Sequence, residues 1–270
     1  MEIISAILLG IIQGATEFLP VSSSGHLLLA EHFFQVEGAS LTFDVMLHLA
    51  TLGAILVYFR RDFTSLTLAF FGRPTPGDNG RQRQLAIYIC AATVPAVVAG
   101  LLLGKYAETI FRSPALVAVS LSVAGLLLLW AEKAGRHARH MEKLRFRDAM
   151  LIGCAQALAL IPGVSRSGAT ITAGLFLGLT RDTAARFSFL LSAPVVAGAG
   201  GYKAMKLFSG PGLSNDQLLF YGAGFIAAAL SGYAIIAFLM RFVQTKSLAV
   251  FAYYRFAITA IVFIALALGY

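Results

Sequence analysis

The stretch QGATEFLPVSSSGH, residues 13–26, places a carboxylate, three serine hydroxyls and an imidazole inside otherwise apolar sequence. Ionisable groups in such surroundings are energetically costly and indicate a functional site. Pro20 ends one helix, because its ring removes a backbone donor and clashes with the preceding turn. Ser22 to Ser24 then offer N-cap oxygens for a second helix. The stretch therefore predicts a broken helix whose new N-terminus directs free N–H groups at an anion, most often phosphate.

A second copy of this stretch occurs later, as QALALIPGVSRSGAT at residues 156–170. When Gln13 is placed over Gln156 without gaps, Gly10 falls on Gly153, Val21 on Val164, Ser22 on Ser165, Ser24 on Ser167 and Gly25 on Gly168. The two copies differ in chemistry, because Arg166 replaces Ser23 and Leu160 replaces Glu17. The pattern favours an internal repeat with one acidic and one basic member.

The composition is that of a polytopic helical membrane protein. Of the 270 residues, 58% are hydrophobic and only 13% are charged, which fits no soluble globular class. Cys90 and Cys154 lack metal or redox spacing and are interpreted as structural thiols. The net charge is +8, and the basic residues gather in loops, where they indicate the orientation in the membrane. The sequence has no aromatic-basic motif typical of nucleic-acid binding.

The chain divides into two halves with one plan. Each half begins with a broken pair of helices too short to span a membrane, which predicts a re-entrant hairpin. The first repeat, residues 1–131, has its hairpin at 2–36 and spans at about 43–59, 85–104 and 114–131. The second, residues 149–270, has its hairpin at 149–179 and spans at about 184–205, 217–240 and 248–269. A polar, basic connector, residues 132–148, joins them.

The expected fold is an all-α membrane protein with six transmembrane helices, two re-entrant hairpins and an inverted-topology repeat. Three spans separate the hairpins, and an odd number of crossings inverts the second unit. Fifteen of the 21 lysines and arginines fall in loops on one side, and only Lys105, Arg112, Lys203 and Lys206 on the other. The first side is therefore expected in the cytoplasm, with both termini and the mouth of the first hairpin outside.

Glu17 is expected to have a partner, because a buried unpaired carboxylate would cost several kcal/mol. The candidates are Arg166 and a divalent cation, and a purely structural ion pair is the alternative. Gln13 lies one helical turn earlier on the same face. Its amide oxygen would either join Glu17 at a metal ion or bond the broken backbone.

The serines and the histidine suggest nucleophilic chemistry. One of Ser22, Ser23 and Ser24 is expected to be a plain N-cap, and Ser23 stands out because it aligns with Arg166. A hydroxyl nucleophile needs a base within hydrogen-bond reach, and His26 follows one turn later. The alternative for His26 is a helix residue bonded to a carbonyl. Glu31, His32 and His48 are interpreted as structural.

Arg166 sits between two serines at the second helix start, where a guanidinium complements phosphate bidentately. Thr170, one turn on, would add a hydroxyl donor. The alternative role for Arg166, holding the hairpins together, is compatible with binding phosphate. Arg255, the other arginine within the membrane, is expected near the cytoplasmic end of the last span and is interpreted as snorkelling.

These motifs together resemble the undecaprenyl-diphosphate phosphatases, the bacitracin-resistance proteins. The resemblance covers the whole chain, including Tyr254-Arg255-Phe256. It implies an enzyme of the bacterial cytoplasmic membrane that converts undecaprenyl diphosphate to undecaprenyl phosphate and phosphate, recycling the carrier for peptidoglycan synthesis. It also implies a divalent cation, Mg²⁺ or Ca²⁺. Position 13 is Gln here, where many members carry Glu.

Matched residue by residue, the resemblance assigns three groups of site residues. The acidic motif falls on Gln13 and Glu17, the serine-histidine motif on Ser22, Ser23 and His26, and the phosphate-binding motif on Ser165, Arg166, Ser167 and Thr170. We therefore expect catalysis by Glu17, Ser23, His26 and Arg166, with phosphate bound by Ser22, Ser24, Ser165, Ser167 and Thr170.

The alternative function is a transporter or flippase of an anionic lipid or small anion, because inverted repeats with broken helices are transporter architecture. The Glu-Ser-His cluster favours hydrolysis, since transport needs no nucleophile. The expected partners are the lipid substrate and the bilayer, with no nucleic acid. A homodimer is compatible with this interpretation. The sequence leaves open whether Ser23, His26 or water is the nucleophile.

Overall fold

The computed structural model describes residues 3–34, 41–73, 80–110, 113–208 and 214–269. Within these ranges every regular element is a helix, apart from a single β-bridge between Arg139 and Leu179. The elements are α1 Ile3–Phe18, α2 Ser23–Phe34, α3 Leu41–Tyr58, α4 Arg60–Phe70, α5 Arg81–Ile110, α6 Pro114–Ala134, η1 Met141–Lys143, α7 Phe146–Ala157, η2 Leu158–Leu160, α8 Arg166–Phe176, α9 Arg181–Phe208, α10 Asn215–Thr245 and α11 Ala249–Ala267. The predicted all-α membrane fold is confirmed.

The long apolar helices follow the predicted spans. Helices α5, α6, α9, α10 and α11 are long and apolar enough to cross a membrane, and α3 with α4 makes a sixth if the bent pair counts as one. Pro114 begins α6 as its first residue, where its missing N–H costs nothing. Helices α5, α6, α9 and α10 extend beyond the predicted limits, because polar residues at their ends continue the helical backbone past the apolar stretch, whereas α11 lies within the predicted limits.

Helix α4 was not predicted. The chain bends by 81° between α3 and α4, and α4 then continues in a new direction. It begins with Arg60, Arg61 and Asp62 and buries Leu66 and Ala69. This distribution is typical of an amphipathic helix that lies at a membrane surface. Such a helix is too short and too polar to be predicted as a transmembrane span.

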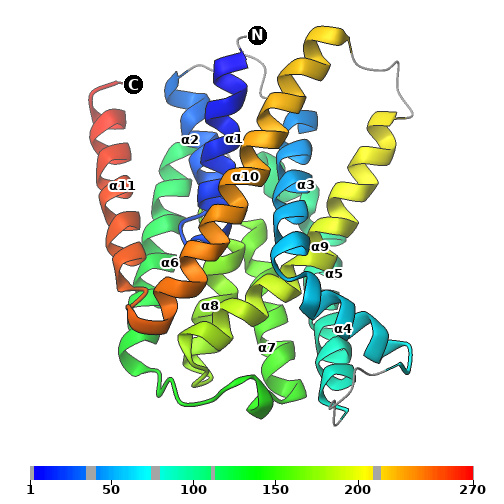
Figure 1. Cartoon of the computed structure of the whole chain (residues 1–270). Coiled ribbons are helices and arrows are strands. Elements are labelled where there is room, and N and C mark those ends of the chain that lie inside the picture. The colour runs from blue at the N-terminus through cyan, green and yellow to red at the C-terminus, as the bar shows by residue number, and fades with distance from the viewer. Residues whose placement is uncertain (1–2, 35–40, 74–79, 111–112, 209–213, 270) are drawn as a thin grey trace.

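The two hairpins enter the bundle from opposite sides. Helices α1 and α2 run from the side where α1 begins and α11 ends, whereas α7 and α8 lie toward the other side (Figure 1). None of these four helices exceeds 16 residues, below the roughly 20 needed to span a bilayer. The breaks therefore lie inside the bundle, where protein and not lipid surrounds the irregular backbone.

Each hairpin packs against the second span of the other half. Helix α1 packs on α10, and α7 packs on α5. Gly10 faces the backbone of Gly224, and Gly153 faces the backbone of Ala92, so closely that a side chain at either glycine would collide. Gly10 and Gly153 are the positions that the sequence register paired. This reciprocal packing is what an inverted repeat requires, although the residue limits assigned to each repeat remain a prediction.

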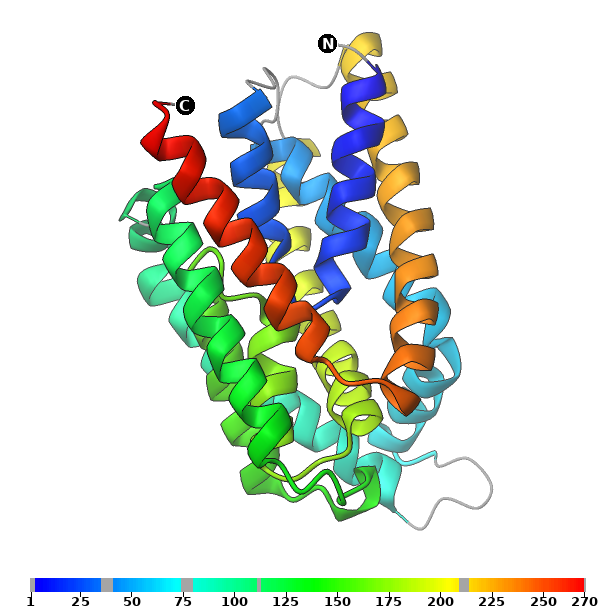
Figure 2. The ribbon, with the colours of Figure 1, turned by 90° about the vertical axis from the view of Figure 1, so that its left-hand side faces the viewer.

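The third spans of the two halves pack together, with α11 alongside α6 (Figure 2). The connector between the halves is anchored and does not hang free. Arg139 donates to the carbonyl oxygens of Leu177 at 2.8 Å and Lys143 at 2.7 Å, and it pairs with Asp148. These contacts fix the segment between α6 and α7 against the end of α8.

Candidate active site

The two breaks have the same local structure. Ser22 and Ser165 adopt positive φ angles of 75° and 71°, which only glycine adopts without strain. Each serine caps the helix that follows, because Ser22 Oγ accepts from Gly25 N at 3.3 Å and Ser165 Oγ accepts from Gly168 N at 3.1 Å. These two pairs are the ones that the sequence register aligned. Ser22 and Ser165 are therefore buried caps, and their role as phosphate ligands stays a prediction.

The breaks are bonded directly to each other. The N–H of Gly163 donates to Ser22 Oγ at 3.2 Å. Ser167 Oγ lies 3.0 Å from the carbonyl oxygen of Leu19 and 3.3 Å from that of Glu17. The starts of α2 and α8 are therefore held close together, and each contributes the backbone N–H groups that lack intrahelical partners. Two positive helix ends converge on one region.

Arg255 reinforces this junction, and its place corrects the expectation of a snorkelling side chain. It is fully buried, and Nε donates to the carbonyl oxygen of Pro20 at 2.5 Å while Nη1 donates to that of Val164 at 3.3 Å. One guanidinium thus binds both breaks. The sequence could not reveal this, because hydropathy does not tell which span packs against the breaks.

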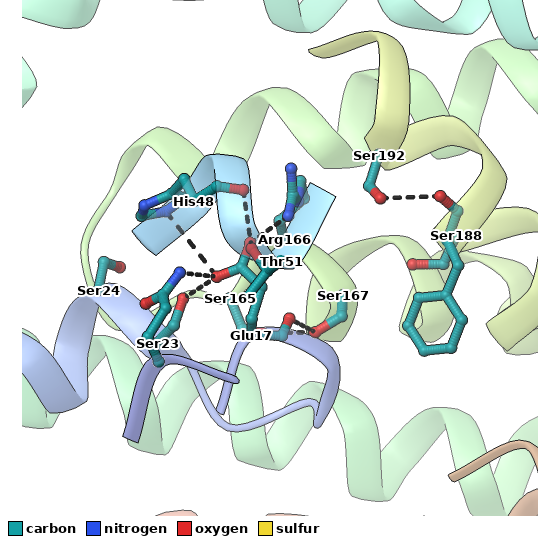
Figure 3. A network of polar contacts seen from close by, with 12 residues as sticks. Glu17, Ser23, Ser24, His48, Thr51, Ser165, Arg166, Ser167, Ser188 and Ser192 are labelled. Atoms are coloured by element: carbon teal, nitrogen blue, oxygen red, sulfur yellow. Dashed lines mark hydrogen bonds and ion pairs between the residues drawn. The ribbon is translucent and has the colours of Figure 1, made fainter. Parts of the chain in front are cut away.

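Glu17 lies at the centre of the site, at the end of α1. Its carboxylate accepts from Gln13 Nε2 at 3.0 Å and from the Ser23 hydroxyl, and it forms an ion pair with Arg166 (Figure 3). The side chain of Glu17 is 4% exposed and that of Arg166 is 17% exposed. Four polar side chains from α1, α2 and α8 therefore converge on one point, and Arg166 is the partner that the sequence required.

His48 of α3, which the sequence led us to interpret as structural, also reaches this cluster. Its Nε2 lies 3.8 Å from Glu17 Oε2, and its Nδ1 is bonded to the carbonyl oxygen of Asp44 at 2.8 Å (Figure 3). The side chain is one-third exposed, so it lies at the open side of the carboxylate. Nothing in the sequence places α3 beside the break, and the signal was therefore absent.

His26 does not contact Ser23 as expected. Its Nδ1 is bonded to the carbonyl oxygen of Ser22 at 2.8 Å, and its Nε2 is bonded to the hydroxyl of Tyr254 at 2.8 Å. The spacing of three residues placed the ring one turn from Ser23, but Ser23 turns back toward the end of α1. The hydrogen-bond acceptor of the Ser23 hydroxyl is the Glu17 carboxylate.

The remaining predicted phosphate ligands differ in accessibility. Ser24 is exposed, with its hydroxyl 3.4 Å from that of Ser22. Thr170 is buried, donates to the carbonyl oxygen of Arg166 at 2.8 Å and bonds Ser188 at 2.6 Å. Ser167 is also buried against the first break. Of these three residues, Thr170 and Ser167 are hydrogen-bonded to buried protein groups and Ser24 is exposed, and their role as phosphate ligands stays a prediction.

The site can contribute to a metal centre without forming one alone. In the part of the chain that the structure describes, no group of three or more His, Cys, Asp or Glu side chains is placed to hold a metal ion. However, Gln13 Oε1 is buried without a hydrogen-bond partner, beside the Glu17 carboxylate. One carboxylate and one amide oxygen suit a cation that takes its other ligands from substrate phosphate and water.

Comparisons with known proteins agree on one family. The profile of the bacitracin resistance protein BacA matches residues 6–261. An undecaprenyl-diphosphatase of Rubrobacter xylanophilus is 49% identical over 97% of each chain. Proteins with the same name from Moorella thermoacetica, at 45% identity over 97% of each chain, and Geobacter sulfurreducens, at 49% over 94% of this chain and 95% of its own, are similarly close.

Proposed function

The chain belongs to the bacitracin resistance protein BacA family, and on this premise we propose that it is an undecaprenyl-diphosphate phosphatase. It hydrolyses the terminal phosphate of undecaprenyl diphosphate, releasing undecaprenyl phosphate and phosphate, and so recycles the lipid carrier for cell-wall synthesis. The observation that carries the proposal is the convergence of Ser23 and Arg166 on Glu17, where the two helix breaks meet.

The location of the site suits an amphipathic substrate. A diphosphate headgroup must reach polar groups while its polyprenyl tail stays in lipid, so the site must lie at membrane depth. The two helix starts and the permanently charged Arg166 supply positive potential there. Donors already aimed at the place where phosphoryl charge develops are the main source of catalysis in phosphoryl transfer.

We expect substrate binding to redistribute the contacts of Glu17. In the structure Arg166 is paired with Glu17. When a diphosphate approaches, the Arg166 guanidinium donates charge-assisted hydrogen bonds to the diphosphate oxygens. Glu17 then keeps its hydrogen bond from Ser23 and becomes the acceptor of the Ser23 proton. The same ion pair therefore holds the site together and places Glu17 beside Ser23.

The reaction has two balanced steps. Ser23 Oγ forms a bond to the terminal phosphorus while the bond from that phosphorus to the bridging oxygen breaks, so undecaprenyl phosphate leaves with that oxygen. The Ser23 proton passes to Glu17. Water then attacks the phosphoserine, giving its proton to His26 Nε2, and Ser23 Oγ leaves with the proton that Glu17 held. Direct attack by water, with Ser23 as a ligand, is the rival route.

A divalent cation, Mg²⁺ or Ca²⁺, would be held by Glu17 and Gln13 Oε1, and it would supply positive charge next to the phosphate oxygens. Gln13→Ala should raise the Mg²⁺ concentration needed for half-maximal rate about tenfold, because one ligand is lost. It should weaken Mn²⁺ binding, followed by electron paramagnetic resonance, to the same degree. The matched control is Gln156→Ala, which removes the buried amide at the corresponding position of the second break. Equal metal binding by wild type and Gln13→Ala would remove Gln13 from the site.

The orientation in the membrane is part of the proposal. The basic loops at the α7–α8 side should face the cytoplasm, and the mouth of the first hairpin and both termini should face outward. The site therefore accepts substrate from the outer face of the inner membrane. The family and the apolar helices support a multi-pass protein of that membrane.

Cysteine labelling checks this orientation in cells. In a background with Cys90 and Cys154 replaced by serine, Ala138→Cys should react with a membrane-impermeant reagent only after the membrane is opened. Asn215→Cys should react in intact spheroplasts. Both positions are exposed. Labelling of Ala138→Cys in intact spheroplasts would reverse the proposed orientation.

The activity itself is tested by product analysis. Purified protein in detergent with Mg²⁺ should release one phosphate and one undecaprenyl monophosphate for each undecaprenyl diphosphate consumed. The alternative, a transporter of an anionic lipid, is not favoured, because the named relatives are phosphatases. Movement of intact undecaprenyl diphosphate across a vesicle membrane without phosphate release would support the transporter and refute the phosphatase.

A further inference from the structure

His26 has both ring nitrogens engaged, and its second partner has no role in the reaction described so far. Tyr254 of α11 places its hydroxyl 2.8 Å from His26 Nε2. The two rings are stacked, with centroids 5.6 Å apart and planes 8° from parallel. Tyr254 is 228 residues from His26 in the chain, so this contact is a product of the fold and not of local helix geometry.

The hydrogen bonds determine the tautomer of His26. A carbonyl oxygen only accepts, so the bond to Ser22 requires that Nδ1 carry a proton. In the neutral ring Nε2 then presents its lone pair, and the Tyr254 hydroxyl donates to it. Both ring nitrogens therefore have a fixed role, and Nε2 is defined as the proton-accepting atom.

The neighbouring residue anchors this arrangement to the site. Arg255 follows Tyr254 in α11 and binds the carbonyl oxygens of Pro20 and Val164 in the two breaks. A single turn of α11 therefore fixes both the backbone of the breaks and the ring of His26. Tyr254 is 40% exposed, and its hydroxyl must leave Nε2 before that nitrogen can accept a proton from water.

We propose that Tyr254 is a positioning residue for the phosphatase that acts through His26. Its hydroxyl keeps Nε2 as the proton acceptor and holds the ring in one orientation, so that the base is ready for the attacking water. This inference rests on the proposed function, and it assigns to α11 a part in setting up the second step of the reaction.

Tyr254→Phe removes the hydroxyl and keeps the ring. The loss of one neutral hydrogen bond should lower kcat about three- to tenfold. The KM should stay within about twofold, because the base acts after the substrate has bound. Tyr253→Phe is the matched control. Tyr253 directly precedes Tyr254, is exposed, and packs its ring on Phe256. It should leave both constants unchanged. A Tyr254→Phe enzyme with wild-type kcat would overturn the proposal.

A double-mutant cycle separates positioning from an independent role. If Tyr254 acts through His26, then Tyr254→Phe should have no further effect in a His26→Ala enzyme. An undiminished effect in that background would show that Tyr254 works without His26 and would overturn the proposal.

A spectroscopic readout does not depend on activity. In protein with ¹⁵N-labelled histidine, the resonance of His26 Nε2, assigned with His26→Ala, should move in Tyr254→Phe and stay in place in Tyr253→Phe. An unmoved resonance would show that no hydrogen bond reaches Nε2, against the proposal. Failure of wild-type protein to release phosphate would count against the proposed function, whereas an active enzyme indifferent to Tyr254→Phe counts against this inference alone.

Discussion

Replacing Ser23 with alanine is expected to reduce phosphate release on the order of 10³-fold or more, because the variant lacks the attacking atom. The reason lies in the contact between Ser23 and Glu17, in which the hydroxyl proton already points at the carboxylate that would accept it. Steady-state phosphate release by the purified variant measures the effect. Ser24→Ala is the comparison, because the exposed Ser24 can contribute at most a hydrogen bond to phosphate, so its loss should cost about tenfold at most.

The size of the Ser23 effect decides between two mechanisms. A serine that only donates one neutral hydrogen bond to substrate contributes about 0.5–1.5 kcal/mol, which is about tenfold at most. A variant that keeps a tenth or more of the wild-type rate, together with no phosphoserine after rapid acid quench, would make water the nucleophile in the first step. The site and the overall reaction would be unaffected by that result.

Arg166→Lys is expected to lose on the order of 10²–10³ in kcat although the charge is kept. A lysine ammonium cannot make the planar two-point contact with phosphate that a guanidinium makes. The variant still has a cation near Glu17, so the junction between the hairpins should remain folded. Rates of phosphate release and the thermal midpoint of unfolding, measured on the same preparation, separate catalysis from stability.

Arg186→Lys is the matched control, because Arg186 pairs with Asp62 and its side chain is 49% exposed, outside the site. It should turn over at the wild-type rate. If Arg166→Lys also turned over at a near-normal rate, Arg166 would serve to hold Glu17 and the two hairpins, and the phosphate would be positioned by the helix starts alone.

The transmembrane spans and the two helix breaks could be predicted from the sequence, because each has a signal in its own residues. Apolar length predicts the spans, and Pro20 and Pro162 each precede a serine that caps the next helix, which predicts the breaks. The register of the repeat even paired Ser22 with Ser165, and these two share an unusual positive φ. Helix α4 was missed because an amphipathic surface helix has neither the length nor the hydropathy of a span.

The composition of the site was predictable only where one break contacts the other. Arg166 could be named as one candidate partner of Glu17, beside a divalent cation, because a buried carboxylate requires a cation and the second break carries one. The positions of His48, Tyr254 and Arg255 could not be predicted, since they depend on which spans pack against the breaks. The bond of His26 to a backbone carbonyl is the alternative that the sequence left open, whereas its contact with Tyr254 was missed for the same reason.

The most direct test of the central claim is phosphate release from undecaprenyl diphosphate by purified wild type and Glu17→Gln, measured side by side with Mg²⁺. The substitution keeps the shape of the side chain, but it removes the charge that pairs with Arg166 and the base that accepts the Ser23 proton. We expect turnover by wild type and a loss on the order of 10²-fold or more in Glu17→Gln. Equal turnover by the two proteins, or none by wild type, would contradict it.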